Sequence, residues 1–213
     1  MRSDLKVLLP ILVLISSICH SQIVDSIGVM TEDNYIEKMS NQLAMDMSFN
    51  NSYEIFEVKN EMPTFDDMAE MTLTEYVFQE TLRFYPSVMI LNRRTTRDVH
   101  VNGYDIPANT MIMLSPPFTH RMEEWWSNPL EFDPMRFSPE RAEHKRHGFS
   151  YVPFGGGAHK CIGMHFALMN AKLYLFRLLK NYKVTLRPGY DPAFMHVHLP
   201  RPVDGLPITL TKI

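Results

Sequence analysis

The chain has 213 residues, of which 45% are apolar, 21% charged and 11% aromatic, a composition typical of a folded globular domain. The 21 Lys and Arg residues against 24 Asp and Glu residues leave a net charge of -3. Because a nucleic-acid-binding surface needs a basic field, we expect no nucleic-acid partner. The two cysteines, Cys19 and Cys161, exclude a disulfide scaffold and a zinc site built from paired cysteines.

Residues 1–22 have the order of a targeting segment. Arg2 and Lys6 precede an apolar run over residues 7–15, and serines follow it. The run is shorter than the ~20 residues of a membrane span. This segment is therefore interpreted as a signal peptide or a membrane anchor, or else as the remnant of a core helix. The first two interpretations place the protein in the secretory route or on a membrane, and the third places it in the cytoplasm.

A helix and a hairpin are the clearest elements expected in the first half. Residues 72–75 read Thr-Leu-Thr-Glu, a capping-box pattern that opens a helix over residues 75–84, which Pro86 then stops. Asn102-Gly103 lies between two alternating runs and predicts a β-hairpin. Residues 115–160 are rich in proline, glycine and aromatic residues without periodicity, which predicts ordered irregular backbone.

A glycine-rich loop leads to Cys161 at the start of a helix. Apolar residues recur at helical spacing after it as far as about Tyr182, which predicts one long helix. The N–H groups and the positive dipole end of its first turn would stabilise a negatively charged sulfur. Three consecutive glycines, residues 155–157, leave room for a flat ligand. A lone cysteine is more often a small buried hydrophobe, so the prediction depends on the ten-residue context.

That context, residues 154–163, resembles the cysteine loop of the cytochrome P-450 (P450) family of haem-thiolate monooxygenases. The family's pattern has Phe, Gly, Arg or His, Cys and Gly at fixed spacing, and it is matched by Phe154, Gly157, His159, Cys161 and Gly163. The resemblance implies that Cys161 is the thiolate metal ligand of haem b, iron protoporphyrin IX. It also implies that Phe154 shields the sulfur and that His159 reaches a haem propionate.

A second resemblance lies on the capped helix. Glu80 and Arg83 are three residues apart, so they share one helix face, and alone they would be an ordinary surface pair. The phrase that follows, residues 82–86, and the later segment Phe-Asp-Pro-Met-Arg-Phe at residues 132–137 are both similar to the family's. The resemblance implies that Glu80, Arg83 and Arg136 form a buried structural triad.

Three further expectations come from the resemblance. Arg93, five residues before Asp98, would pair with a haem propionate, although a solvated basic pair with Arg94 is the alternative. The apolar residues 88–91 would border a pocket for a lipophilic substrate. Thr31 is the counterpart of the family's proton-delivering threonine, but Met30 replaces the acid before it, so a normal relay is not expected.

The resemblance begins near Glu54 and continues to the C-terminus. It implies a mostly α fold with small β-sheets (α+β), the C-terminal half of the family's fold, and short strands are expected after the long helix. Residues 23–213 would form a partial haem domain. The implied activity inserts one atom of dioxygen into an apolar substrate. The alternatives are a haem-binding protein or a non-functional fragment without turnover.

The implied partner is a flavin or iron-sulfur electron donor. Basic residues near the cysteine loop in the sequence could form its docking face, with a solvated surface cluster as the alternative. These residues are Arg141, Lys145, Arg146, Lys160 and Lys172.

Overall fold

The computed structural model describes residues 63–187, 189–190, 193–195 and 201–213. The segment 1–22 and Thr31 lie outside the described residues. The helices are α3 (Phe65–Glu70), α4 (Thr72–Phe84), α5 (Pro116–Thr119) and α6 (Met164–Asn181), with 3-10 turns η1 (Pro134–Phe137), η2 (Glu143–Lys145) and η3 (Gly157–His159). The strands are β1 (Leu91–Arg94), β2 (Val99–Val101), β3 (Tyr104–Ile106), β4 (Met111–Leu114), β5 (Tyr182–Leu186), β6 (Phe194–Met195), β7 (Arg201–Pro202) and β8 (Ile208–Lys212). This mixture of helices and small antiparallel sheets confirms the α+β prediction.

Helix α4 starts earlier than the sequence pattern predicts. The Glu75 N–H already donates to the carbonyl of Met71 at 3.2 Å, so Thr72 lies inside the first turn and does not act as the N-cap. The prediction of a capping box at Thr72 is therefore wrong. A capping box occurs one helix earlier, where the Thr64 hydroxyl accepts from the Asp67 N–H and the Asp67 carboxylate accepts from the Thr64 N–H. The predicted end of α4 is confirmed, because the helix stops at Phe84 before Pro86.

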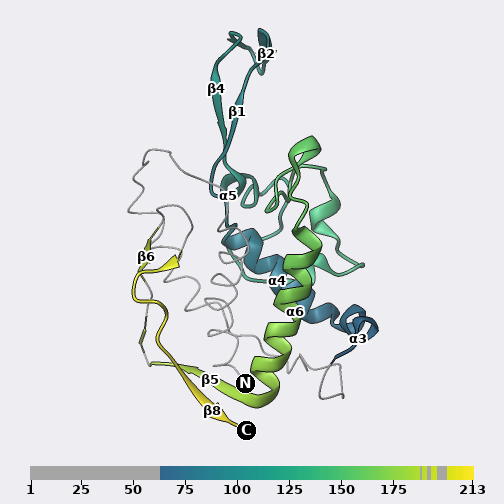
Figure 1. Cartoon of the computed structure of the whole chain (residues 1–213). Coiled ribbons are helices and arrows are strands. Elements are labelled where there is room, and N and C mark those ends of the chain that lie inside the picture. The colour runs from purple at the N-terminus through teal and green to yellow at the C-terminus, as the bar shows by residue number, and fades with distance from the viewer. Residues whose placement is uncertain (1–62, 188, 191–192, 196–200) are drawn as a thin grey trace.

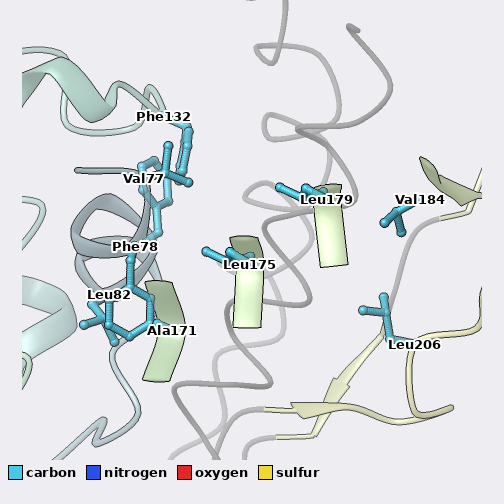
Figure 2. Packing of buried hydrophobic residues seen from close by; sticks show 10 residues of the cluster. Val77, Phe78, Leu82, Phe132, Ala171, Leu175, Leu179, Val184 and Leu206 are labelled. Atoms are coloured by element: carbon cyan, nitrogen blue, oxygen red, sulfur yellow. The ribbon is translucent and has the colours of Figure 1, made fainter. Parts of the chain in front are cut away.

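The core forms where α4 crosses α6 (Figure 1). Helix α6 follows the predicted period, and Ala171 and Leu175 on its inner face are fully buried. They lie against Phe78 and Leu82 of α4, as Figure 2 shows. The cluster continues through Leu179 towards the C-terminal strands. Burying each large apolar side chain contributes about 1.5–3 kcal/mol, so this crossing fixes both helices that carry the site.

The strands form four two-stranded antiparallel sheets among the described residues. The ladder of β1 with β4 extends away from the helices and carries the β2–β3 hairpin at its far end (Figure 1). Asn102 and Gly103 have φ of 50° and 84°, and a type I′ turn requires positive φ at both central residues. This confirms the hairpin prediction. Strand β5 pairs with β8 after α6, in line with the short strands expected there.

Residues 115–160 contain only short helical turns, as predicted for irregular backbone. Many loop hydrogen bonds order this segment, and it links the β1–β4 ladder to the glycine-rich loop. In the part of the chain that the structure describes, no helix is both long enough and apolar enough to span a membrane.

Candidate functional site

Cys161 lies three residues before the first residue of α6. Its N–H donates to the carbonyl of Phe154 at 2.9 Å, which closes the loop over residues 154–161. The thiol is half-buried and is not part of a disulfide. Gly163 is the N-cap of α6, and a Cβ there would lie 3.7 Å from the Cys161 Sγ atom. The sulfur is therefore held at the mouth of the helix.

The glycines give the loop a shape that other residues would not adopt. Gly155 and Gly157 have φ of 75° and 67°, in the left-handed region that side chains disfavour. At Gly156 the limit is space, because a Cβ would come within 3.0 Å of the Phe149 ring. The loop therefore turns tightly without placing a side chain at these three positions.

A buried charge network lies between α4 and η1. Both Glu80 oxygens accept from Arg83, at 2.8 Å from Nε and 2.9 Å from Nη2, and Arg136 Nε is 3.2 Å from Glu80 Oε1. None of the three side chains is more than 1% exposed. The Asp133 N–H also donates to Glu80 Oε1 at 2.9 Å. One carboxylate thus receives two guanidinium groups and a backbone N–H, a charge-assisted arrangement that ties the helix to the irregular segment.

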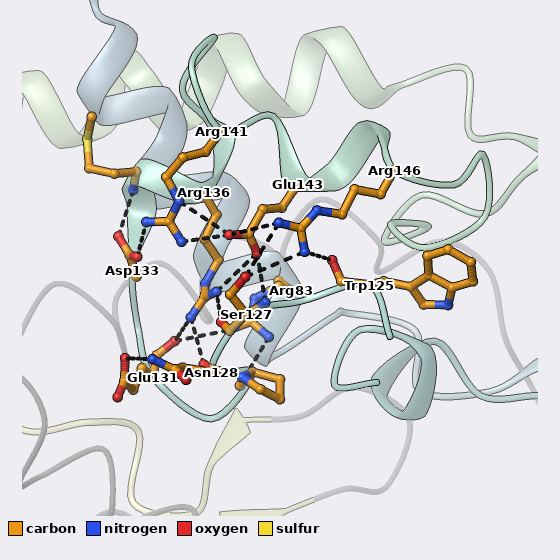
Figure 3. A network of polar contacts seen from close by, with 12 residues as sticks. Arg83, Trp125, Ser127, Asn128, Glu131, Asp133, Arg136, Arg141, Glu143 and Arg146 are labelled. Atoms are coloured by element: carbon orange, nitrogen blue, oxygen red, sulfur yellow. Dashed lines mark hydrogen bonds and ion pairs between the residues drawn. The ribbon is translucent and has the colours of Figure 1, made fainter. Parts of the chain in front are cut away.

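A second carboxylate, Glu143, extends the network (Figure 3). Its Oε2 atom is 3.2 Å from Arg136 Nη1 and accepts from the Ser127 N–H at 3.0 Å, while Oε1 accepts from Arg141 at 2.7 Å. Burial alone would raise the pKa of Glu143, but these donors and the nearby positive charges hold it below its usual value. The network thus contains two buried carboxylates, those of Glu80 and Glu143, and two buried guanidinium groups, those of Arg83 and Arg136. Glu143 was not predicted from the sequence, because it lies in the aperiodic segment 115–160, where a spacing of seven residues from Arg136 does not indicate a shared helix face.

Backbone carbonyls satisfy the remaining guanidinium donors. Arg83 donates to the carbonyls of His120 and Pro129, each at 2.8 Å. Its guanidinium carbon also lies 4.4 Å from the centre of the Phe84 ring and 5.2 Å from that of Trp126. Complete pairing matters here because an unpaired buried charge is strongly destabilising.

Comparison with known proteins decides the family. The cytochrome P450 family model matches residues 39–199. The chain belongs to the cytochrome P450 family. It is 41% identical to the putative cytochrome P450 136 of Mycobacterium tuberculosis over 146 residues, and 37% identical to cytochrome P450 4c21 of Blattella germanica over 158 residues. These alignments cover 68% and 74% of this chain but 30% and 31% of the relatives.

The solved structures give the same family. Retinoic acid bound cyanobacterial CYP120A1 superimposes with a TM-score of 0.71 and 26% identity, over 96% of this chain and 43% of that one. This confirms the prediction of part of the cytochrome P450 fold. The chain spans about a third of the length of the curated P450 relatives that it matches.

Membership of the P450 family implies haem b as the cofactor, and the loop fits such a group. Cys161 would supply one sulfur donor, and the glycine turn leaves the neighbouring backbone free of side chains. Ile162, the next residue, is fully exposed, and Phe166 in the first turn of α6 is 63% exposed, so the chain after Cys161 presents apolar surface that a bound apolar group would cover. Among the described residues, no cluster of three or more metal-ligating side chains occurs.

The structure places the other predicted cofactor residues partly in the cysteine loop and partly on β1. Phe154 is half-buried and packs against the core, while Gly157 and His159 form the exposed turn η3. Arg93 lies on β1, where it is half-buried and donates to the carbonyl of Asn92 at 2.7 Å. Its neighbour Arg94 is exposed and bonds Asn109. Of the two arginines, Arg93 is thus the less exposed.

The predicted basic docking face is wrong in one member. Lys172 is 6% exposed, 2.6 Å from Glu75 Oε2, and donates to the carbonyl of Met68 at 2.9 Å. It connects α6 to α3 and α4 and cannot meet a partner, because its place on the inner side of α6 buries it. Lys160 and Lys145 are exposed.

Proposed function

We propose that Cys161 is the thiolate ligand of haem b and that the protein is a haem-thiolate monooxygenase acting on a lipophilic substrate. The observation that carries this proposal is the half-buried cysteine at the mouth of α6, closed into its loop by the hydrogen bond to Phe154, in a chain of the P450 family. The first turn of a helix favours a negatively charged sulfur there.

The proposal assigns separate tasks to this chain's residues. Phe154 limits the access of water to the sulfur, and the exposed ring of His159 donates to one propionate, with the half-buried Arg93 as the second propionate partner. The network of Glu80, Arg83 and Arg136 keeps α4 and the segment before the loop in place and takes no part in chemistry. Thr31 is the counterpart of the family's proton-delivering threonine and lies outside the described residues, and with Met30 in place of the acid no normal relay is proposed.

When bound, haem supplies the activation of dioxygen, from which one atom enters the substrate and the other leaves as water, at the expense of two electrons and two protons. The half-buried apolar residues 88–91 support a lipophilic substrate. The cyanobacterial neighbour has retinoic acid bound, which agrees with that class. Electrons would come from a flavin or iron-sulfur donor, docked near the exposed Lys160.

A carbon monoxide difference spectrum of the dithionite-reduced chain tests the ligand. The unchanged protein, loaded with haem, should give the red-shifted Soret band of thiolate ligation. Cys161→Ser should lose this band, and Cys19→Ser, the matched change at the other cysteine, should keep it. A band that survives Cys161→Ser would refute Cys161 as the ligand.

Turnover needs a separate measurement. Oxidation of retinoic acid and of fatty acids by the haem-loaded chain, with a reductase and NADPH, should give a hydroxylated product that incorporates one atom of ¹⁸O₂. Haem-thiolate spectra without any product would identify a haem-binding protein without turnover. That result would refute the monooxygenase and leave the ligand assignment intact.

A further inference from the structure

His120 connects the C-terminal end of α4 to the segment that leads into the cysteine loop. Its side chain is fully buried. Nδ1 is 3.2 Å from the carbonyl oxygen of Arg83, and Nε2 accepts from the Val152 N–H at 2.9 Å. Val152 lies two residues before Phe154, whose carbonyl accepts from the Cys161 N–H. Three hydrogen bonds and the backbone of residues 152–154 thus join α4 to Cys161.

The two partners fix the tautomer of the imidazole. A backbone N–H can only donate, so Nε2 carries no proton, and the proton lies on Nδ1, where it is donated to the Arg83 carbonyl. Burial and the charges of Arg83 and Arg121 lower the pKa of His120 to about 3. The ring is therefore neutral at physiological pH.

Arg83 and His120 are joined by two hydrogen bonds, in each of which the side chain of one residue contacts the backbone carbonyl of the other. The Arg83 guanidinium donates to the His120 carbonyl at 2.8 Å, and the His120 ring donates to the Arg83 carbonyl. That carbonyl is one of the last four of α4, which have no partner within the helix. His120 therefore caps α4, and through Arg83 it is hydrogen-bonded to the buried charge network.

A second contact joins the same segment to α4 one helical turn away. The Tyr151 hydroxyl donates to the carbonyl of Gln79 at 2.9 Å, and Gln79 and Arg83 are four residues apart on one helix face. Tyr151 and His120 also pack ring against ring, with centroids 5.4 Å apart. Residues 151–152 are thus attached to α4 at two points. The Tyr151 side chain bonds α4 directly, and the Val152 N–H bonds His120, which in turn bonds α4.

We infer that His120 is a positioning residue of the haem-thiolate site: its neutral imidazole, by accepting from the Val152 N–H, sets the position of the loop that carries Cys161. The inference rests on the proposed role of Cys161. It assigns His120 no contact with haem, oxygen or substrate.

Two amide substitutions separate the two nitrogens of the ring. His120→Gln places an amide oxygen where Nε2 accepts from Val152, whereas His120→Asn keeps a donor for the Arg83 carbonyl and loses the acceptor. Both put a neutral amide in the same buried place, so each is a control for the other's effect on folding. His100→Asn, at an exposed histidine of β2, is the control for residue type.

The first readout needs no haem. In apo-protein carrying Cys19→Ser, the reaction of Cys161 with a disulfide reagent should be roughly tenfold faster in His120→Asn than in the unchanged chain, the factor that one buried hydrogen bond represents. His120→Gln and His100→Asn should react at the unchanged rate. The second readout is the carbon monoxide difference spectrum of haem-loaded protein, in which His120→Asn should lose the red-shifted band that His120→Gln keeps.

Equal thiol reactivity in His120→Gln and His120→Asn, whether both are fast or both are unchanged, would overturn the inference, because the acceptor at Nε2 would then not set the loop. If the unchanged chain binds no haem, the proposed function fails, and the thiol reactivity still decides the role of His120.

Discussion

Protonation of His120 should destabilise the fold at mildly acidic pH. The folded protein disfavours the charged imidazolium form, because a proton on Nε2 would face the Val152 N–H donor and because Arg83 and Arg121 lie nearby. Burial lowers the pKa of His120 from 6.5 to about 3, whereas in the unfolded chain the ring keeps its usual value near 6.5.

The sign and size of the effect follow from these two values. Between pH 6.5 and 3 the unfolded chain binds a proton that the folded chain excludes, so stability falls as the pH falls. The contribution of the neutral ring is complete above pH 6.5. About 2 kcal/mol of it should be lost between pH 7 and pH 5, and roughly 4 kcal/mol by pH 3.

Urea unfolding at pH 7, 6 and 5, followed by the fluorescence of the buried Trp126, measures this loss. His120→Gln is the reference, because it keeps the acceptor for Val152 and does not titrate. Carboxylates such as Glu143 contribute equally to both proteins, so the difference between them isolates the histidine. If both proteins lose the same free energy of unfolding between pH 7 and pH 5, the assigned burial and tautomer of His120 are wrong.

Three other predictions concern stability and can be checked by urea unfolding at pH 7. Glu80→Gln removes the charge shared by two buried arginines and should cost about 3–5 kcal/mol; a loss under about 1 kcal/mol would show that the network does not depend on that charge. Leu175→Ala should cost about 2–5 kcal/mol because the side chain is fully buried, whereas Leu130→Ala, at a 51% exposed position, should change stability by less than about 0.5 kcal/mol. Gly157→Ala should cost about 1–2 kcal/mol because of its φ of 67°, while Gly148→Ala, where a Cβ also meets open space, should not destabilise; equal effects would rule out backbone strain as the cause.

Local patterns predicted the elements whose contacts are close in sequence. The apolar period of α6, the Asn102-Gly103 turn and the stop at Pro86 each depend on residues within a few positions of one another. The resemblance of the cysteine loop to a known family also depends on one continuous segment. The start of α4 was missed because Thr-x-x-Glu is common, and only the hydrogen bond of Glu75 to Met71 shows which residue caps the helix.

The sequence by itself determined the family, the cysteine loop and its long helix, because these are written in continuous motifs and short periods. The tertiary structure decided which distant groups meet. Tyr151 reaches Gln79 across 72 positions and His120 reaches Val152 across 32, and Lys172, predicted on the surface, is buried beside Glu75. No spacing encodes such pairs, because their distances are set by how α4, α6 and the irregular segment pack together.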